Sequence, residues 1–473
     1  MEDSAPPTIE DRRREATVGL DRAHRSSFGQ FFTPAPTARF MASLIEPVAA
    51  HVPAILDPGA GIGLLSIALL DHLKGRAAVT AYELEPHFQK GLHETLSHFP
   101  GTHRVEHRDF IEHAVTLAST GKGSRYDIAI LNPPYKKIQS GSAHRALLRK
   151  LGVETSNLYT CFLACAIALC VKGAQVVAII PRSWMNGVYF RPFRYWLLDR
   201  VALTRTHVFD RRDRAFSDDG VLQENVIVKL VVGAPQGAVE VSASSDDRFH
   251  DVRKKVVSFS EVVTPGDKEK FIHIPTLGSV ATAGLPGKPL REIGLDICTG
   301  PVVDFRLRAH LHMLPESGDA PLLYATHFSG GVVEWPKQTR KPNAIAINDE
   351  TRQWLMPAGT YVVTRRFTSK EERRRVVAFF LSGDALRGAA WVGFENHLNV
   401  FHCNKRGLEP AVARGLCVYL NSQPVDDYFR TFSGHTQVNA TDLRRLCYPS
   451  QEELRAIGDR NAQESPRGAG NIG

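Results

Sequence analysis

The chain has 473 residues, of which 43% are hydrophobic, and a formal net charge of +8 at pH 7. This length exceeds one ordinary hydrophobic core, so two or more domains are expected. No apolar run reaches the ~20 residues that a bilayer-spanning helix needs, and the charged N-terminal stretch lacks the apolar segment of a secretory signal. We therefore expect a cytoplasmic protein without a membrane partner. The basic charge is compatible with a polyanionic partner, but equally with an ordinary soluble protein.

The seven cysteines are scattered, which fits a reducing compartment. Cys161, Cys165 and Cys170 lie in an apolar run of helical character. The first two share a helical face, but no histidine or second cysteine pair completes a zinc set. We predict buried free thiols and no metal site.

The N-terminal part predicts a leader followed by a loop and a helix. Residues 1–27 are polar and rich in arginine, as in a frayed leader or a short helix. Thr33-Pro34 then precedes apolar residues at helical spacing from Thr37 onward. Proline commonly opens a helix, so an amphipathic helix is expected after this loop.

Residues 52–70, VPAILDPGAGIGLLSIALL, predict a strand, a tight glycine turn and a helix, with Asp57 at the end of the strand. Glycines let a backbone approach a ligand closely, and a helix N-terminus favours a polar or anionic group. A second strand ends in Glu83, 20 residues after Gly63. An acid at this place can accept hydrogen bonds from both ribose hydroxyls of a nucleoside cofactor. A plain surface carboxylate is the alternative interpretation.

Residues 105–110 predict a third strand with an acid and an aromatic ring at its tip. Asp109 could accept the exocyclic amine of an adenine, and Phe110 could lie on the ring. In isolation, Asp109 is more typical of a helix N-cap before the apolar stretch that follows.

The fourth predicted strand, residues 126–131, runs into the loop Asn132-Pro133-Pro134-Tyr135. Two prolines cannot donate backbone hydrogen bonds, so the sheet must stop there. The loop presents bare carbonyls, a side-chain amide and an aromatic face. Such a loop could hold a planar amino group by its two hydrogens.

The pattern that follows alternates between helices and strands. It predicts a mobile loop over 136–153, a helix over 158–171, a strand over 174–181, a helix over 191–198 and two strands within 201–232. Phe216 lies in the charged loop between those last two strands, where it could tuck into the surface or stack on a base. The alternation predicts an α/β fold with a doubly wound sheet, whose ligand site lies outside the carboxyl ends of the strands.

The β/α rhythm is lost after a junction at residues 233–250. We therefore predict a catalytic domain over 28–240, a mixed α+β domain over 241–450 and a disordered tail over 451–473.

Within the second domain, residues 359–367 predict a strand and residues 370–380 a basic helix. Five arginines between Arg365 and Arg375 form either a solvated charged face or a phosphate-binding surface. The polar loop over 433–441 is rich in the side-chain types that read base edges.

Five stretches, FGQFFTP, LDPGAGIG, YELE, RDF and NPPY, occur in the order found in the N6-adenine DNA methyltransferases of the gamma class, the TaqI-like type, and the chain resembles that family. In that class a target-recognition domain follows the catalytic motifs. TGPVVDFR, VVTRRF and FSGHTQVNATDLRRLCYP are similar to stretches of type II restriction-system modification enzymes, in particular the PstI/BsuBI group, which acts on CTGCAG.

The resemblance implies S-adenosyl-L-methionine (AdoMet) as cofactor, with no metal. Thr33 would meet its methionine part, Asp57 with the backbone of Pro58, Gly59 and Ala60 its amino group, Glu83 its ribose, and Asp109 with Phe110 its adenine, while Pro134 would border it. Ala60 stands where the family often has cysteine, but this position contributes mainly backbone.

The resemblance further implies that the methyl group goes to N6 of an adenine turned out of double-stranded DNA. Asn132 and Pro133 would accept the two N6 hydrogens, Tyr135 would stack on the base, and Phe216 would pack against it. The implied setting is a bacterial restriction system, in which the enzyme acts as a monomer at the nucleoid. A cognate restriction endonuclease acting separately is compatible with it.

Three alternatives remain open from the residues. The same loop occurs in methyltransferases that act on RNA or on glutamine amides of proteins, although these usually lack the FFTP stretch and a large second domain. A non-catalytic nucleic-acid-binding protein on a decayed fold is a second alternative, opposed by the intact Asp57, Glu83 and NPPY. A fused restriction–modification enzyme is a third, opposed by the absence of a nuclease-like PD-(D/E)xK stretch in a strand context.

Overall fold

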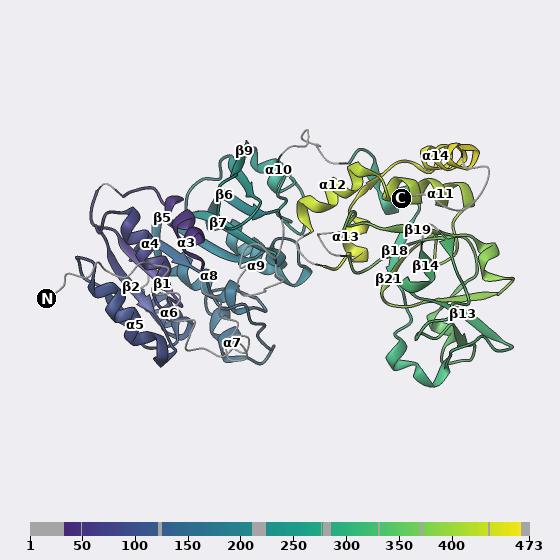
Figure 1. Ribbon diagram of the computed structural model, residues 1–473, viewed down its shortest axis with the longest axis horizontal. Coiled ribbons are helices and arrows are strands. Elements are labelled where there is room, and N and C mark those ends of the chain that lie inside the picture. The colour runs from purple at the N-terminus through teal and green to yellow at the C-terminus, as the bar shows by residue number, and fades with distance from the viewer. Residues whose placement is uncertain are drawn as a thin grey trace. The chain divides into compact units, whose positions relative to one another are not determined.

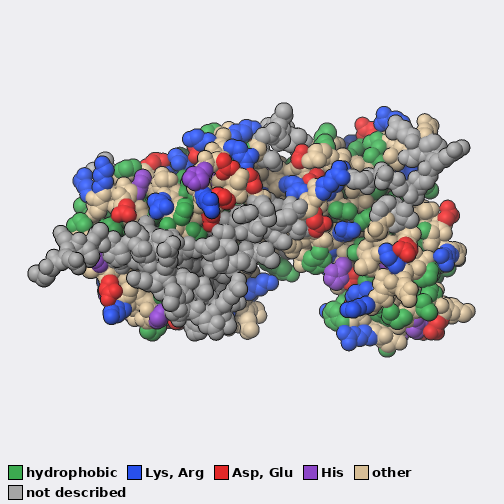
Figure 2. All heavy atoms as spheres, in the orientation of Figure 1, with side chains coloured by type: hydrophobic (Ala, Val, Ile, Leu, Met, Phe, Trp, Pro, Cys, Tyr) green, Lys and Arg blue, Asp and Glu red, His purple; other side chains and the backbone are tan. Residues whose placement is uncertain are grey.

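The computed structural model describes residues 33–48, 50–121, 125–210, 224–275, 277, 285–329, 332–368, 372–433 and 436–464. The chain divides into two compact units, Met1–Gly278 and Ser279–Gly473. No helix among the described residues is long and apolar enough to cross a membrane. On the face shown in Figure 2, the described Lys and Arg side chains are interspersed with Asp and Glu rather than gathered in one patch.

A nine-stranded sheet, counted over the described residues, organises the first unit (Figure 1). Its order is β3-β2-β1-β4-β5-β7-β6-β8-β9. The first five strands of that order run parallel, and β7 is antiparallel to both of its neighbours. The strands are β1 (Ala54–Pro58), β2 (Ala78–Tyr82), β3 (Arg104–Glu106), β4 (Tyr126–Leu131), β5 (Cys170–Pro181), β6 (Val201–Phe209), β7 (Asn225–Val232), β8 (Val239–Ser244) and β9 (Arg253–Val257). This order confirms the predicted doubly wound α/β fold.

Helices cover both faces of this sheet. One core contains residues of α3, α4 and α5, and the other contains residues of α6, α7, α8 and α9. The helices of the first unit are α3 (Ala35–Ser43), α4 (Leu64–His72), α5 (Pro86–Ser97), α6 (Phe110–Ser119), α7 (Ala143–Arg149), α8 (Leu158–Leu169), α9 (Arg191–Leu198) and α10 (Phe259–Val262). Helix α7 lies inside the stretch predicted as a mobile loop, so that prediction was wrong for its seven residues.

Strand β4 shows why the central strands read as apolar runs. Ile128 and Ile130 belong to one core, whereas Ala129 and Leu131 belong to the other. Successive side chains of a strand point to opposite faces, so a strand covered on both sides is apolar throughout. The same burial extends into α8, where Cys161, Cys165 and the following Cys170 are buried free thiols as predicted.

The connections place a switch point between β1 and β4. The chain passes from β1 to β2 and then β3 on one side, and returns to pair β4 with the other edge of β1. In open α/β sheets a ligand crevice forms outside the carboxyl ends of the strands at such a point.

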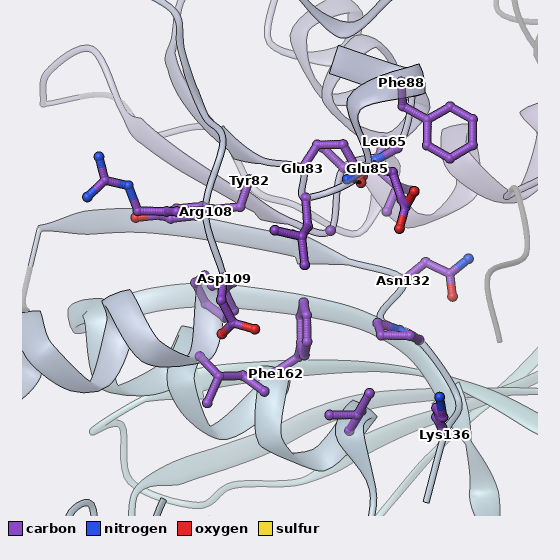
Figure 3. A pocket seen from close by; sticks show the side chains of 18 of the residues that line it. Leu65, Tyr82, Glu83, Glu85, Phe88, Arg108, Asp109, Asn132, Lys136 and Phe162 are labelled. Atoms are coloured by element: carbon purple, nitrogen blue, oxygen red, sulfur yellow. Dashed lines mark hydrogen bonds between the residues drawn. The ribbon is translucent and has the colours of Figure 1, made fainter. Parts of the chain in front are cut away.

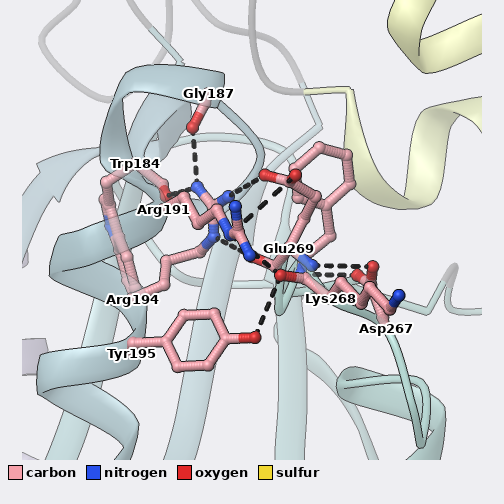
Figure 4. Close-up of polar contacts among 9 residues, drawn as sticks. Trp184, Gly187, Arg191, Arg194, Tyr195, Asp267, Lys268 and Glu269 are labelled. Carbon is pink, nitrogen blue, oxygen red and sulfur yellow. Dashed lines mark hydrogen bonds and ion pairs between the residues drawn. The ribbon is translucent and has the colours of Figure 1, made fainter.

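The first unit extends to Gly278, beyond the predicted end of the catalytic domain at residue 240. Strands β8 and β9 pair in sequence onto β6, so the stretch taken for a junction continues the sheet. Arg194, a buried arginine of α9, holds the segment around Glu269, which follows α10 in the chain (Figure 4). It donates hydrogen bonds to the carbonyls of Trp184, Gly187 and Glu269 over 2.9, 2.7 and 2.9 Å.

Short strands and four helices build the described part of the second unit. A four-stranded sheet has the order β11-β21-β18-β19 and a five-stranded sheet the order β12-β16-β13-β20-β17. The strands are β10 (Lys288–Pro289), β11 (Asp296–Thr299), β12 (Leu311–His312), β13 (Asp319–Leu323), β14 (Phe328–Ser329), β15 (Val332–Val333), β16 (Ala344–Ala346), β17 (Leu355–Pro357), β18 (Tyr361–Arg365), β19 (Ala378–Leu381), β20 (Trp391–Phe394), β21 (Leu398–His402) and β22 (Cys447–Tyr448). The helices are α11 (Pro410–Leu420), α12 (Gln423–Phe432), α13 (Ala440–Arg444) and α14 (Gln451–Glu464). A mixed α+β unit was predicted, and β18 confirms the strand expected within 359–367.

Two predictions for this unit were wrong. The basic helix expected over 370–380 is absent from its described residues, of which Ala378 onward form β19 and pair with β18. Residues 451–464, expected to be disordered, form α14. Helix α14 packs on α11 through two glycines: a Cβ on Gly415 would lie 1.8 Å from the Leu454 carbonyl oxygen.

Candidate active site

A cavity of about 250 Å³ lies at the carboxyl ends of β1, β2 and β4 (Figure 3). In the close-up, Asn132 and Lys136 lie toward one end and Arg108 toward the other, with Glu83 and Glu85 along one side. Its wall from α8 includes Phe162. The cavity therefore occupies the place that the switch point of the sheet predicts.

The glycine turn between β1 and α4 forms one wall. Gly59, Gly61 and Gly63 all have positive φ, at 71°, 59° and 86°. The left-handed conformation at Gly63 favours glycine, and a Cβ there would also press on the end of the Leu92 side chain in α5, at 2.9 Å. The Ala60 N–H donates to the Tyr82 carbonyl over 2.8 Å, which ties the turn to the end of β2.

Glu83, directly after β2, is 3% exposed and lines the cavity. Its Oε2 accepts a hydrogen bond from the Gly61 N–H over 2.7 Å, and its Oε1 accepts one from the Glu85 N–H over 2.8 Å. Burial raises the pKa of this carboxyl, and the two backbone donors oppose that shift. Each oxygen keeps a further lone pair, so the carboxylate is oriented yet still able to accept from a ligand.

Asp57 is 1% exposed and lies at the end of β1. Its Oδ2 accepts from the Ser66 hydroxyl over 2.6 Å, while Oδ1 has no hydrogen-bond partner among the described residues. Burial raises the pKa of this carboxyl to about 7. A buried acceptor without a donor is costly, so this atom favours a ligand that brings an N–H group.

Asp109 caps helix α6 and also lines the cavity. It is the N-cap of α6, where Oδ1 accepts from the Glu112 N–H over 2.9 Å, and it also lines the cavity. Oδ2 accepts from Nε2–H of His144 over 3.0 Å. Burial opposes ionisation of Asp109 and is the largest single influence, but the hydrogen bonds from His144 and the Glu112 N–H and the charge of His144 together outweigh it, so the pKa of Asp109 is lowered overall. The same hydrogen bond raises the pKa of His144.

The Asn132-Pro133-Pro134-Tyr135 loop is held by side-chain hydrogen bonds. Nδ2 of Asn132 donates to the Thr33 hydroxyl over 3.1 Å, and Oδ1 of Asn132 accepts from the Tyr135 hydroxyl over 3.0 Å. The Ile179 carbonyl lies 3.2 Å from the same tyrosine hydroxyl and is a second acceptor for it. Burial raises the pKa of Tyr135 well above its usual value, so this phenol stays a neutral donor.

The structure brings most of the predicted residues to one cavity. Its lining contains Thr33, Gly59, Ala60, Glu83, Asp109, Phe110, Asn132 and Pro134. Asp57, Pro58, Pro133 and Tyr135 adjoin these residues in the chain but are not part of the lining. Phe216 lies outside the described residues.

Several lining residues were missed by the sequence analysis. Arg108 precedes Asp109 and Lys136 follows the NPPY loop, so proximity in sequence could have indicated both. His144 lies on α7, which was taken for a mobile loop. Phe162 lies on α8 among buried residues, and its ring centroid is 5.3 Å from that of Phe110. An apolar residue within an apolar helix gives no signal that it faces a ligand.

The fold and the cavity together define a class. A glycine turn after β1, a buried acid after β2 and an NPPY loop after β4, on a doubly wound sheet with a switch point between β1 and β4, are the features of the AdoMet-dependent methyltransferase fold. A solved complex of DrdV with DNA aligns with 96% of this chain and 59% of that chain, at a TM-score of 0.52 and 13% identity, which supports the likeness in fold alone.

Two relatives narrow the class to a family. The type II methyltransferase M.BsuBI of Bacillus subtilis is 46% identical over 462 residues, which cover 93% of this chain and 91% of that protein. M.PstI of Providencia stuartii is 40% identical over 475 residues, covering 95% and 92%. The family model of the Eco57I restriction-modification methylase matches residues 72–216. The chain belongs to the type II restriction–modification methyltransferases.

Proposed function

We propose that this protein transfers the methyl group of AdoMet to N6 of an adenine turned out of double-stranded DNA, and so marks host DNA in a restriction–modification system. The carrying observation is the amide of Asn132, oriented at one end of a cavity whose lining also holds the buried carboxylate of Glu83 and the half-buried carboxylate of Asp109. Near full-length similarity to two type II methyltransferases supports DNA as the substrate.

The residues around the cavity fit AdoMet. Oδ1 of Asp57 is a buried acceptor without a partner among the described residues, as an amino group requires. Glu83 retains acceptor capacity for the ribose hydroxyls, and Phe110 and Phe162 supply aromatic surface for the adenine. When bound, AdoMet supplies a methyl group made electrophilic by its sulfonium.

The chain's own contribution to the transfer is to make the N6 amine a better nucleophile. The lone pair of this amine is delocalised into the purine ring. Acceptance of its two hydrogens by Oδ1 of Asn132 and the Pro133 carbonyl favours sp³ character and directs the lone pair away from the ring. These hydrogen bonds strengthen as positive charge develops on N6, so they stabilise the transition state more than the ground state.

Thr33 and Tyr135 hold the amide for this task. Because Thr33 accepts from Nδ2, Oδ1 is the atom left to face the target amine. The Tyr135 hydroxyl has Ile179 as an alternative acceptor, so it can release Oδ1 when the amine arrives. The ring of Tyr135 and that of Phe216 remain our proposed stacking partners of the base. No strong general base is needed, because N6 becomes acidic only after it gains the methyl group.

Sequencing that detects modified bases, applied to DNA from cells expressing the protein, tests this function. We expect N6-methyladenine at one short motif, and the resemblance to the PstI/BsuBI group makes CTGCAG the first motif to inspect. Methylated cytosine would contradict the adenine assignment, and unmodified DNA together with methylated RNA or protein would contradict the substrate. Cells expressing Asn132→Ala are the matched control.

We further propose that the enzyme acts as a monomer, since modification requires only one strand per visit, and that any cognate endonuclease is a separate protein. Sedimentation of the protein with and without DNA tests the first point.

A further inference from the structure

A second cavity, of about 370 Å³, lies wholly within the second unit. Its lining includes the aromatic residues Tyr324 and Phe367, the cations Lys341 and Arg365, and the Glu395–His397 pair. None of these residues belongs to the methyl-transfer site. Aromatic rings, cations and a buried carboxylate in one cavity are the groups that recognise a nucleotide, by stacking, phosphate contact and hydrogen bonding.

Phe367 forms an exposed aromatic wall of this cavity. Phe367 is 43% exposed, unusual for a large apolar side chain that lines a cavity. Its ring centroid lies 5.1 Å from that of His397, with 42° between the ring planes. The guanidinium of Arg366 lies 5.8 Å from the same ring. A planar ligand could therefore cover Phe367 at little cost in rearrangement.

The cations are held by contacts that leave them at the cavity. Nζ of Lys341 lies 2.9 Å from Oδ2 of Asp304 and 5.1 Å from the centroid of Tyr324. The guanidinium of Arg365 lies 3.9 Å from Glu372 and 5.4 Å from the Phe379 ring. These ion pairs are partly exposed and weak, so a phosphate could compete for both cations.

The cavity also holds polar groups that could read a base. Glu395 is 1% exposed, and its two oxygens accept from the backbone N–H and from Nδ1–H of His397 over 3.0 and 2.5 Å. The Tyr324 hydroxyl is buried and has no hydrogen-bond partner among the described residues. A carboxylate keeps capacity for further donors, and carboxylates in DNA-binding proteins accept from base amino groups.

Residues 436–438 of the polar loop noted in the sequence lie beside this cavity. The Thr368 N–H donates to the Thr436 carbonyl over 3.0 Å, and the Val438 N–H donates to the Arg366 carbonyl over 2.8 Å. Phe367 thus pairs with Gln437 across an antiparallel bridge. Thr436 is exposed and Gln437 half-buried, and both side-chain types contact base edges.

We propose that this cavity, with the adjoining Thr436–Gln437 edge, is a base-reading site of the second unit. One DNA base, unstacked from its neighbours, lies against Phe367, the adjoining phosphates contact Lys341 and Arg365, and the Glu395 carboxylate faces a base amino group. This inference rests on the proposed function and adds to it the residues through which DNA is recognised.

The test measures duplex affinity by fluorescence anisotropy, using a short duplex that carries the motif found by sequencing and a scrambled duplex. Phe367→Ala removes the stacking surface, and Trp354→Ala removes a 38%-exposed aromatic residue of the same unit outside the cavity. We expect Phe367→Ala to weaken binding of the motif duplex by about 5- to 150-fold. We expect Trp354→Ala to change it by less than about twofold.

A second pair of variants tests the phosphate contact. Lys341→Gln should weaken binding of both duplexes and lower the slope of log affinity against log salt by about one. Lys288→Gln, at an exposed lysine outside the cavity, should leave that slope unchanged. An effect of Phe367→Ala no larger than that of Trp354→Ala would overturn the proposal.

The outcome also separates this inference from the proposed function. Wild-type protein that leaves cellular DNA unmodified contradicts the function, whatever the variants do. Wild-type protein that methylates DNA, with a Phe367→Ala variant that binds both duplexes normally, contradicts the base-reading site alone. Binding of free deoxynucleoside monophosphates that depends on Phe367, without an effect on duplex binding, would assign the cavity to a small ligand instead. AdoMet affinity, measured by calorimetry, should be the same in all variants.

Discussion

The side-chain amide of Asn132 donates a hydrogen bond to the hydroxyl of Thr33, a residue 99 positions earlier in the chain. Thr33 lies just before α3, whereas Asn132 lies just after β4. In the proposed mechanism this contact fixes which atom of the amide faces the target amine, so Thr33, which we assign to the cofactor, would also orient the residue that we assign to the substrate.

Replacing Thr33 by valine keeps the shape of the side chain and removes the acceptor. The Asn132 amide can then rotate, and the single-turnover rate of methyl transfer should fall by about 5- to 100-fold, the range of one lost buried hydrogen bond. Thr33→Ser keeps the hydroxyl and is the matched control, expected to retain most of the rate. Equal rates for the valine and serine variants would show that the contact does not orient the amide.

Asn132→Ala removes the acceptor itself. Because the effect is confined to the reacting amine, methylation should fall by at least about 100-fold, as for other preorganised contacts to developing charge. AdoMet binding, measured by calorimetry, should stay within about threefold of wild type. If AdoMet binding were lost to the same extent as methylation, Asn132 would belong to the cofactor site instead.

The residues that line the cavity were largely predictable because they lie at the ends of local sequence patterns. A buried strand, a glycine turn and a proline-rich loop each leave a signal within about ten residues, and parallel strands bring their carboxyl ends to one edge. His144 was not predictable in this way. It reaches Asp109 only because α7 forms over a stretch whose Ser and Gly residues suggested a loop.

In the second unit, tertiary contacts override the secondary structure that the local sequence pattern predicts. Residues 370–380 have the charge pattern of an exposed helix, yet Ala378, Phe379 and Phe380 at the end of this stretch pair with β18. Arg375 is only 2% exposed: its backbone N–H donates to Asp426 of α12 and its guanidinium to Ser433. Neither partner can be recognised from the sequence around Arg375. The sequence therefore suggested that this buried arginine belongs to a charged surface.

Helix α14 gives a prediction about stability. A Cβ on Gly458 would lie 2.0 Å from the Ala411 carbonyl oxygen and 2.9 Å from the Gly415 nitrogen, so Gly458→Ala must push α14 away from α11. We expect a loss of about 1–3 kcal/mol in the unfolding free energy of the second unit, measured by denaturant titration. Asp459→Ala, at the neighbouring exposed position, is the control and should change that free energy by less than about 0.5 kcal/mol. Equal unfolding free energies of the Gly458→Ala and Asp459→Ala variants would mean that α14 can move away from α11 without loss of stability.

The buried Asp57 gives a prediction about pH. Burial raises its pKa from 3.8 to about 7 in the folded protein, so between these values the folded state holds a proton that the unfolded state has released. Without cofactor, the unfolding free energy of the first unit should therefore fall as the pH rises from about 4 to about 7, by on the order of a few kcal/mol. Denaturant titrations of wild type and Asp57→Asn across this range measure it, and the variant should lack this component of the slope.

The same carboxyl should make AdoMet affinity depend on pH in the opposite direction. Only the ionised form of Asp57 offers a charged acceptor to the amino group of the cofactor, so the affinity should rise toward pH 7 and level off above it, by up to tenfold per pH unit on the acidic side. Asp57→Asn should bind AdoMet weakly with little pH dependence, whereas Asp199→Asn, at a 79%-exposed side chain of the same unit, should follow the wild type. A wild-type affinity that stays constant between about pH 5.5 and 8 would remove Asp57 from the cofactor site, because a carboxyl that contacts the amino group and titrates in this range must make the affinity depend on pH.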